Sequence, residues 1–263
     1  MKKSIFITGA AAGIGREAAI LFADKGWFVG ITDVNKRGLH LLNRHLKGKI
    51  GFSALLDVTD EKMVASVLSD FNAAAGGKFD VLFNNAGVLR INNFENIPLK
   101  DQHTILNINN KGVLNCTYHA FPYLKNTSES HVINMASASS IIAAPTLTAY
   151  SASKFWVRGF TEALNMEWKR HGIHVCDIMP NFVSTPMVEQ NPHEIVDNMK
   201  VSITAEDVAK IVLKAARSTR IHWLIDRPLN TMLMKMRYGI IPFSILSYVM
   251  RKKAEIQTID KYK

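Results

Sequence analysis

The 263-residue sequence has only two cysteines, and it contains no apolar run long enough to cross a membrane as a helix. Cys116 and Cys176 lie far apart and match no metal-ligand spacing, so we expect two reduced thiols, no disulfide and no metal site. The apolar run at residues 4–8 is too short for the hydrophobic region of a signal peptide before Gly9 interrupts it. These absences predict a cytoplasmic protein.

Repeats and low-complexity tracts are also absent, and no linker-like composition occurs before about residue 226. We therefore expect one domain, large enough to carry an active site, over residues 1–225 and a C-terminal extension over residues 226–263.

Acidic residues are fewer than basic ones. The sequence has 22 Asp and Glu and 32 Lys and Arg, which gives a formal net charge of +10. Half of the excess falls in residues 226–263, where eight basic residues accompany three acidic ones. Such a charge favours acidic partners such as nucleotides, anionic lipid or nucleic acid. No nucleic-acid-binding module and no basic stretch interleaved with aromatics is present, which argues against nucleic acid.

Short runs rich in Ile, Val and Phe alternate with segments of helical period. Strands are predicted at residues 4–8, 28–32, 49–56, 81–85, 130–137, 174–180 and 221–225, and helices at 15–26, 60–76, 150–172 and 204–217. This alternation predicts an α/β fold with a doubly wound parallel sheet covered by helices.

The stretch TGAAAGIG at residues 8–15 falls between the first predicted strand and the first predicted helix. Gly9, Gly13 and Gly15, with Ala12 and Ile14 between them, would let backbone N–H groups approach a dinucleotide pyrophosphate at the helix N-terminus. The spacing differs from the commoner G-x-G-x-x-G pattern, and glycines that only pack a strand against a helix are the alternative interpretation.

Asp33 follows the second predicted strand, eighteen residues after Gly15. A carboxylate there can accept hydrogen bonds from the adenosine ribose and repel a 2′-phosphate, so the pattern predicts NAD rather than NADP. Arg37 is either a partner for that phosphate or a solvated surface residue.

Four ordered motifs resemble the short-chain dehydrogenase/reductase family over roughly residues 4–225: TGAAAGIG, NNAG at 84–87, Ser137 in INMASAS, and YSASK at 150–154. The resemblance implies one Rossmann-type domain with about seven strands, a nicotinamide cofactor and alcohol/carbonyl redox chemistry. It also implies a homodimer or homotetramer.

Tyr150 and Lys154 are four residues apart on a predicted helix, so their side chains share a face. The ordinary pKa of a phenol is about 10, and a nearby ammonium and oxidised nicotinamide would favour the phenolate, which makes Tyr150 a usable acid/base. An aromatic and a lysine on an ordinary amphipathic helix are the alternative. Ser137 would stabilise charge on the substrate oxygen, and its neighbours Ser139 and Ser140 are decoys or substrate-side contacts.

The resemblance supplies the remaining site residues. It places Asn109, rather than Asn110, in a water-mediated proton relay with Lys154, which also holds the nicotinamide ribose. Further cofactor contacts are implied for Asn84, Ala86 and Gly87 (adenine ribose), Asp57 and Val58 (adenine), and Pro180, Val183 and Thr185 (carboxamide and phosphate). The family usually has glycine after this proline, and we expect Asn181 to preserve the turn because asparagine tolerates positive φ.

Residues 184–200 are expected to cover the substrate, which we predict to be a lipophilic alcohol or ketone: long-chain, steroid-like or isoprenoid. That prediction rests on the apolar and basic extension, which could contact a membrane peripherally, cover the substrate mouth or a partner subunit, or complete the core. A 3-ketoacyl-carrier reductase and a non-catalytic nucleotide-binding regulator are the alternatives. The former typically ends in a glycine-rich VDGG-like segment, which is absent here.

Overall fold

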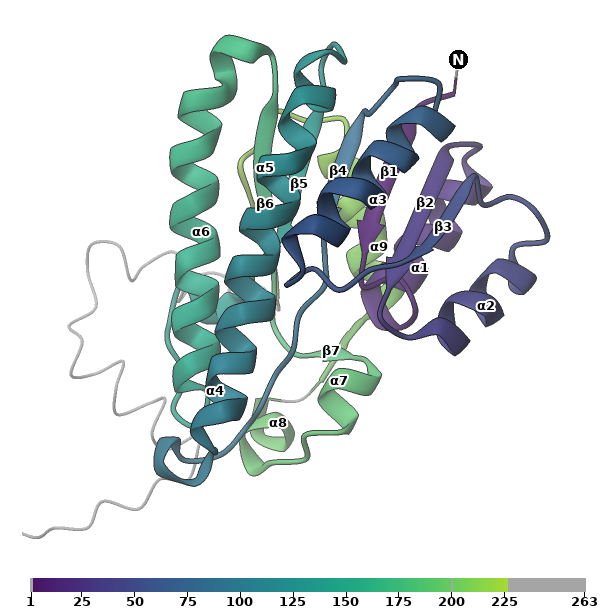
Figure 1. The fold of residues 1–263 in the computed structure, drawn as a ribbon. Coiled ribbons are helices and arrows are strands. Elements are labelled where there is room, and N and C mark those ends of the chain that lie inside the picture. Colours follow the sequence, from purple (N-terminus) through teal and green to yellow (C-terminus); the bar gives the residue numbers. More distant parts are fainter. Residues whose placement is uncertain (1, 200, 227–263) are drawn as a thin grey trace, which may run out of the picture.

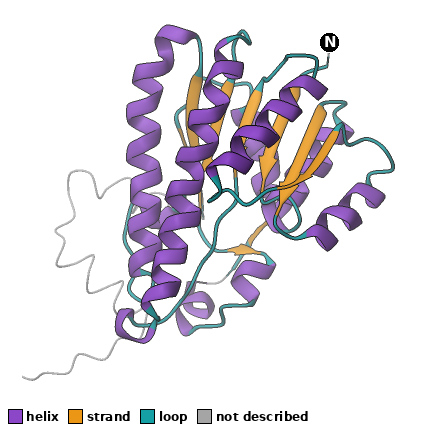
Figure 2. Cartoon of the chain, viewed as in Figure 1, coloured by secondary structure: helices purple, strands orange, loops and turns teal. Residues whose placement is uncertain are grey.

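The computed structural model describes residues 2–199 and 201–226 as an α/β domain built on a seven-stranded parallel sheet. The strand order is β3-β2-β1-β4-β5-β6-β9, and Figures 1 and 2 show the sheet between two layers of helices. The strands are β1 (Ser4–Thr8), β2 (Phe28–Asp33), β3 (Phe52–Leu55), β4 (Val81–Asn84), β5 (His131–Met135), β6 (His174–Pro180) and β9 (His222–Ile225). The predicted doubly wound parallel sheet is confirmed.

Helices cover both faces of the sheet. The long helices are α1 (Gly13–Asp24), α2 (Lys36–His45), α3 (Glu61–Ala74), α4 (Leu99–Leu106), α5 (Gly112–Lys125), α6 (Thr148–Trp168) and α9 (Ala205–Ala215). Two core clusters lie on opposite faces, one beneath α1 and α9 and the other beneath α3 and α5. Along β1, Ile5 and Ile7 belong to the first cluster and Phe6 to the second, as expected where side chains alternate on a strand buried on both faces.

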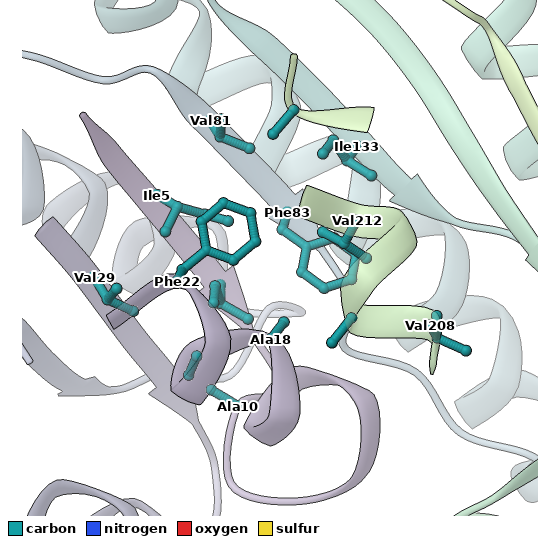
Figure 3. Close-up of a cluster of buried hydrophobic side chains, with 14 of the residues drawn as sticks. Ile5, Ala10, Ala18, Phe22, Val29, Val81, Phe83, Ile133, Val208 and Val212 are labelled. Atoms are coloured by element: carbon teal, nitrogen blue, oxygen red, sulfur yellow. The ribbon is translucent and has the colours of Figure 1, made fainter. Parts of the chain in front are cut away.

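Figure 3 shows the first cluster, in which strand residues such as Ile5 and Phe83 meet Phe22 of α1 and Val212 of α9. Helices α1 and α9 are far apart in sequence and pack directly on each other. Helix α9 begins with a capping box at Thr204. Thr204 Oγ1 accepts a hydrogen bond from the Asp207 backbone N–H, and the Asp207 carboxylate accepts one from the Thr204 backbone N–H.

The carboxyl ends of the parallel strands all lie at one edge of the sheet. Strand β1 pairs with β2 on one side and with β4 on the other, so the strand order changes direction at β1. A crevice for a ligand is expected at such a switch point. Below this edge in Figure 1 lie the short elements β7 (Val183–Ser184), α7 (Pro186–Glu189) and α8 (Glu194–Met199), with β8 (Ile203–Thr204) paired to β7.

Two features bear on the expected extension and on membranes. Beyond Asp226, the extension lies outside the described residues, so the structure neither places it nor tests the predicted domain boundary. Across residues 2–199 and 201–226, no helix has the length and apolar character needed to span a bilayer.

Candidate active site

A cavity of about 290 Å³ opens at the carboxyl edge of the sheet. It runs from the glycine-rich loop after β1 to the first turn of α6 and on to α7 and α8. The predicted site residues that line it are Gly9, Ala12, Gly13, Ile14, Asp33, Ala86, Gly87, Ser137, Tyr150, Lys154, Pro180, Val183 and Thr185. These predicted residues come from six separate stretches of the sequence and converge on one cavity.

The glycine-rich loop needs its glycines for close packing. Gly9 has φ +66°, and a Cβ there would lie 2.8 Å from the Cα of Ala86. A Cβ on Gly15, which does not line the cavity, would lie 2.3 Å from the carbonyl oxygen of Gly9. Close packing at these two positions shapes the loop, and the predicted contacts of the glycines with a cofactor stay predictions.

Helix α1 begins at the cavity with unusually free backbone donors. Its N-cap residue Ala12 provides no side-chain cap, and no acidic residue occupies the first turn. The first N–H groups of a helix have no partner within the helix and carry a partial positive charge, which suits a phosphate. Loop and helix therefore fit a dinucleotide pyrophosphate.

Asn85, for which no role was predicted, holds this loop in place. Its Nδ2 donates to the carbonyl oxygens of Thr8 (3.0 Å) and Gly9 (2.9 Å), and the hydroxyl of Thr8 accepts from the backbone N–H groups of Asn85 and Ala86, each at 3.0 Å. The signal in the sequence was the pair of adjacent asparagines directly after a buried strand.

Asn84, the first of the pair, lies inside the protein and not on the cavity wall. Its Nδ2 donates to Thr117 Oγ1 at 3.0 Å and to Asn134 Oδ1 at 2.9 Å, and Asn134 Nδ2 donates to Thr161 Oγ1 at 2.9 Å. This buried chain of hydrogen bonds ties β4 and β5 to α5 and α6, and the contact of Asn84 with the adenine ribose stays a prediction.

Asp33 is fixed at the end of β2 by two backbone amides. Its Oδ2 accepts from Ala11 N at 3.0 Å and its Oδ1 from Asn35 N at 2.8 Å. Each carboxylate oxygen retains acceptor capacity for a hydroxyl. Arg37 is exposed on α2 and does not line the cavity.

Asp57 and Val58 lie outside the cavity wall. Asp57 is exposed, and its Oδ1 accepts from the backbone N–H and the hydroxyl of Thr59 at 2.9 and 2.8 Å. Val58 is buried against Gly112, where a Cβ would lie 2.5 Å from its Cγ2. Their adenine contacts stay predictions.

Ser137, Tyr150 and Lys154 meet between the end of β5 and the first turns of α6. Ser137 Oγ accepts from the backbone N–H of Ser139 at 3.2 Å, and Lys154 Nζ donates to the carbonyl oxygen of Met135 at 2.8 Å. The ammonium nitrogen lies 5.5 Å from the centre of the Tyr150 ring. Two further donors of the ammonium remain for a ligand.

Burial dominates the electrostatics of this group. It raises the pKa of Tyr150 to about 12, against an opposing hydrogen bond from the Ser137 side chain, and it lowers the pKa of Lys154 to about 8. Within the chain alone, Lys154 does not produce the low phenol pKa that the sequence analysis expected. At neutral pH the phenol is protonated, as a general acid must be.

Asn109 lies behind these residues in a π-helical segment, Asn107–Lys111, between α4 and α5. It is fully buried, its Oδ1 accepts from Val88 N at 2.9 Å, and its Nδ2 donates to Val88 O and Ser153 Oγ, each at 3.1 Å. Asn110 Nδ2 donates to the Ser153 carbonyl at 2.8 Å, so both asparagines contact α6. Single-turn π segments often occur at functional sites.

Asn181 departs from the expected backbone geometry. It is not among the residues with positive φ, so the expectation of a left-handed asparagine is wrong. Its side chain fixes the turn by other means, because Oδ1 accepts from Phe182 N at 2.8 Å and Nδ2 donates to Asp226 Oδ2 at 2.9 Å. Asparagine supplies hydrogen bonds here where glycine would supply only conformational freedom.

The far end of the cavity is apolar. Its wall comes from the loop after β5, from Phe182 and from the short helices α7 and α8, with side chains Ala138, Ile142, Ala144, Leu147, Phe182, Met187, Val188, Ile195 and Met199. Among the described lining residues the charged side chains are Asp33 and Lys154. The predicted substrate-covering segment at 184–200 does form part of this wall.

Known proteins share this architecture. Residues 3–195 match a family model described as short chain dehydrogenase. The chain is 32% identical over 219 residues to a 3-oxoacyl-[acyl-carrier-protein] reductase of Thermotoga maritima, covering 80% of this chain and 89% of that protein.

Two solved structures extend the similarity. A 3-ketoacyl-(acyl-carrier-protein) reductase from Brucella melitensis complexed with NADH superposes with a TM-score of 0.79 at 26% identity, covering 85% of this chain and 96% of that one. The closed form of a serine dehydrogenase complexed with NADP+ gives 0.78 at 25% identity, covering 84% and 94%.

Proposed function

The chain belongs to the short chain dehydrogenase family, and from this premise we propose that it interconverts a lipophilic secondary alcohol and its ketone with NAD(H). The observation that carries the proposal is the convergence of Ser137, Tyr150 and Lys154 on a cavity whose far wall is apolar. A regulator that only bound nucleotide would not need this set.

The roles of the side chains follow from their positions. When bound, the nicotinamide supplies the hydride for reduction or accepts it in oxidation. In reduction, Ser137 Oγ and Tyr150 Oη hydrogen-bond the carbonyl oxygen, and the Tyr150 proton moves to that oxygen as it becomes a hydroxyl. Lys154, anchored on the Met135 carbonyl, directs its remaining donors at the nicotinamide ribose and stabilises the phenolate that Tyr150 becomes.

The preference for NAD is supported by Asp33. Its carboxylate is held at the cavity wall by two backbone amides, so it cannot easily turn away from an added 2′-phosphate. Arg37, the residue that could have compensated, is exposed and outside the wall. The relatives themselves include both an NADH and an NADP+ complex.

Asp33→Asn tests this preference with little disturbance, because asparagine keeps an acceptor for the Ala11 or Asn35 amide while losing the charge. We expect the ratio of kcat/KM with NAD(H) to that with NADP(H) to fall at least tenfold, which corresponds to about 1.4 kcal/mol. An unchanged ratio in steady-state kinetics would show that another residue sets the preference.

The cavity wall supports a lipophilic substrate independently of the extension. Lys154 is the cationic side chain among the described lining residues, and it is buried against Met135 O. A carboxylate, sulfonate or phosphate on the substrate would therefore lose its hydration without gaining a charged partner, which is costly. An apolar chain or ring of the substrate loses no hydrogen bonds to water when it binds against the same wall, and its burial is favourable.

A second candidate is reduction of 3-oxoacyl thioesters, which the names of the Thermotoga and Brucella relatives favour. A kinetic panel separates the candidates: lipophilic secondary alcohols and ketones, short polar ketones, and an acetoacetyl thioester, each with both nucleotides. We expect the highest kcat/KM with lipophilic ketones and NADH. A higher value for the thioester would favour the second candidate, and no turnover of any compound would contradict the proposal.

A further inference from the structure

Ser139 carries a buried hydroxyl that has no hydrogen-bond partner among the described residues. The residue is 8% exposed and borders the cavity, two positions after Ser137. Ser140, the next residue, is fully buried, does not border the cavity and donates its hydroxyl to the Ser137 carbonyl at 2.6 Å. The two serines that the sequence could not tell apart therefore differ in the structure.

An unpaired buried hydroxyl destabilises a folded chain, so its presence needs an explanation. The other polar side chains at this end of the cavity are engaged: Asn181 bonds to Phe182 and Asp226, and Thr185 Oγ1 donates to the Val183 carbonyl at 3.2 Å. The side chains of the neighbours of Ser139 on the wall, Ala138 and Ile142, carry no polar atom. Within residues 2–199 and 201–226 the hydroxyl therefore has no partner, and a bound ligand can supply one.

The distance from Ser137 indicates where that partner lies. The backbone nitrogen of Ser139 is 3.2 Å from Ser137 Oγ, so the two residues lie close together at the same end of the cavity. A serine hydroxyl turns about a single torsion with three staggered positions, which lets it meet a ligand at little cost. A substrate oxygen bound by Ser139 is thus close to the oxygen that reacts at Ser137 and Tyr150.

We propose that Ser139 is a specificity-determining residue that binds a second oxygen of the substrate, on the carbon next to the reacting carbon or one carbon further. The inference rests on the proposed function and narrows its substrate class to 1,2- or 1,3-dioxygenated compounds with an otherwise apolar body. Because Ser139 is neutral, that second oxygen belongs to a hydroxyl, ether or carbonyl group and not to a carboxylate or phosphate. A site built to pair such a group discriminates against analogues that lack it.

The test compares Ser139→Ala with the matched control Ser140→Ala in the full-length chain. The probes are a straight-chain methyl ketone and its α-hydroxy and β-hydroxy analogues, reduced with saturating NADH. In the unsubstituted protein, one of the hydroxylated ketones should have a kcat/KM at least tenfold above that of the plain ketone. Ser139→Ala should abolish this preference by lowering kcat/KM for the hydroxylated ketone about tenfold while leaving the plain ketone unchanged, the value of one neutral hydrogen bond.

Ser140→Ala should change all three ketones by the same factor, because it acts through the backbone of Ser137. Thermal unfolding provides a second readout: Ser139→Ala should keep or raise Tm, since it removes an unpaired hydroxyl, whereas Ser140→Ala should lower it. The inference is overturned if Ser139→Ala affects the plain and hydroxylated ketones equally, if it affects neither, or if it lowers Tm as Ser140→Ala does. Failure of the unsubstituted protein to reduce any ketone would instead reject the proposed function, and this inference with it.

Discussion

At the scale of single residues, the buried ammonium of Lys154 should make the free energy of unfolding depend on pH in the protein without added nucleotide. Its pKa is lowered from 10.5 to about 8 by burial, so between these values the unfolded chain binds more protons than the folded one. The free energy of unfolding therefore rises with pH through this window.

Relative to Lys154→Met, the unsubstituted protein should gain about 2 kcal/mol between pH 7 and 9.5, a range that ends below the unfolded pKa of tyrosine. Urea unfolding at several pH values measures the difference. A difference that stays flat would show that the ammonium is not desolvated.

The spacing alone predicts that Tyr150 and Lys154 lie together, because residues four apart on a helix share a face, and the family resemblance adds Ser137 to the same site. The sequence could not predict that burial would raise the phenol pKa of Tyr150, since burial depends on the whole fold. The hydrogen bonds from Asn85 to the loop after β1 were not predicted for a related reason. Strand pairing decides which of two adjacent asparagines faces that loop.

At the scale of elements, the turn between β1 and α1 should tolerate no side chain at Gly9. Alanine there would need a positive φ and would bring its Cβ within 2.8 Å of the Ala86 backbone. We expect Gly9→Ala to destabilise the protein by about 1–3 kcal/mol and to raise the Kd for NADH at least tenfold, because the loop must shift.

Gly159 is the matched control, since it lies within α6 and a Cβ there meets nothing within 4 Å. Gly159→Ala should stabilise the helix by about 0.5–1 kcal/mol and leave the Kd unchanged. Calorimetric titration and thermal unfolding check both variants, and equal Kd values for the two would contradict the assigned role of the turn.

The strands and the helices α1, α3, α6 and α9 were predictable because their apolar residues follow a clear period. Helices α2, α4 and α5 were not. α2 buries little besides Leu39 and Leu42, while α5 buries the polar Asn115 and Thr117, contains Pro122 and continues from a π-helical segment. In α5 tertiary contacts, rather than a hydrophobic stripe, decide the helix, whereas α2 has an apolar face but spans only ten residues.

At the scale of the whole molecule, the extension after Asp226 should act on lipophilic ligands and not on the nucleotide. The last described residue, Asp226, accepts a hydrogen bond from Asn181 on the cavity wall, so Asp226 lies beside the substrate end of the cavity. Truncation after Arg227 should preserve NAD binding, raise KM for lipophilic ketones and weaken co-sedimentation with anionic liposomes. A folded truncated protein with both quantities unchanged would contradict a membrane or substrate role.

Self-association also belongs to this scale. Leu114 and Tyr118 of α5 and Phe155 and Trp156 of α6 are large apolar side chains with substantial exposure. They are consistent with the expectation of a homodimer or homotetramer, which stays a prediction.

The central claim is that Tyr150 exchanges a proton with the substrate oxygen while a nicotinamide exchanges the hydride. The most direct test is turnover by Tyr150→Phe, with Tyr118→Phe as the matched control because Tyr118 is exposed on α5 and outside the cavity. We expect kcat for a lipophilic ketone to fall by about 10³-fold in Tyr150→Phe, with the Kd for NADH nearly unchanged, and to stay at the unsubstituted value in Tyr118→Phe. A folded Tyr150→Phe protein that retains most of its kcat would contradict the account.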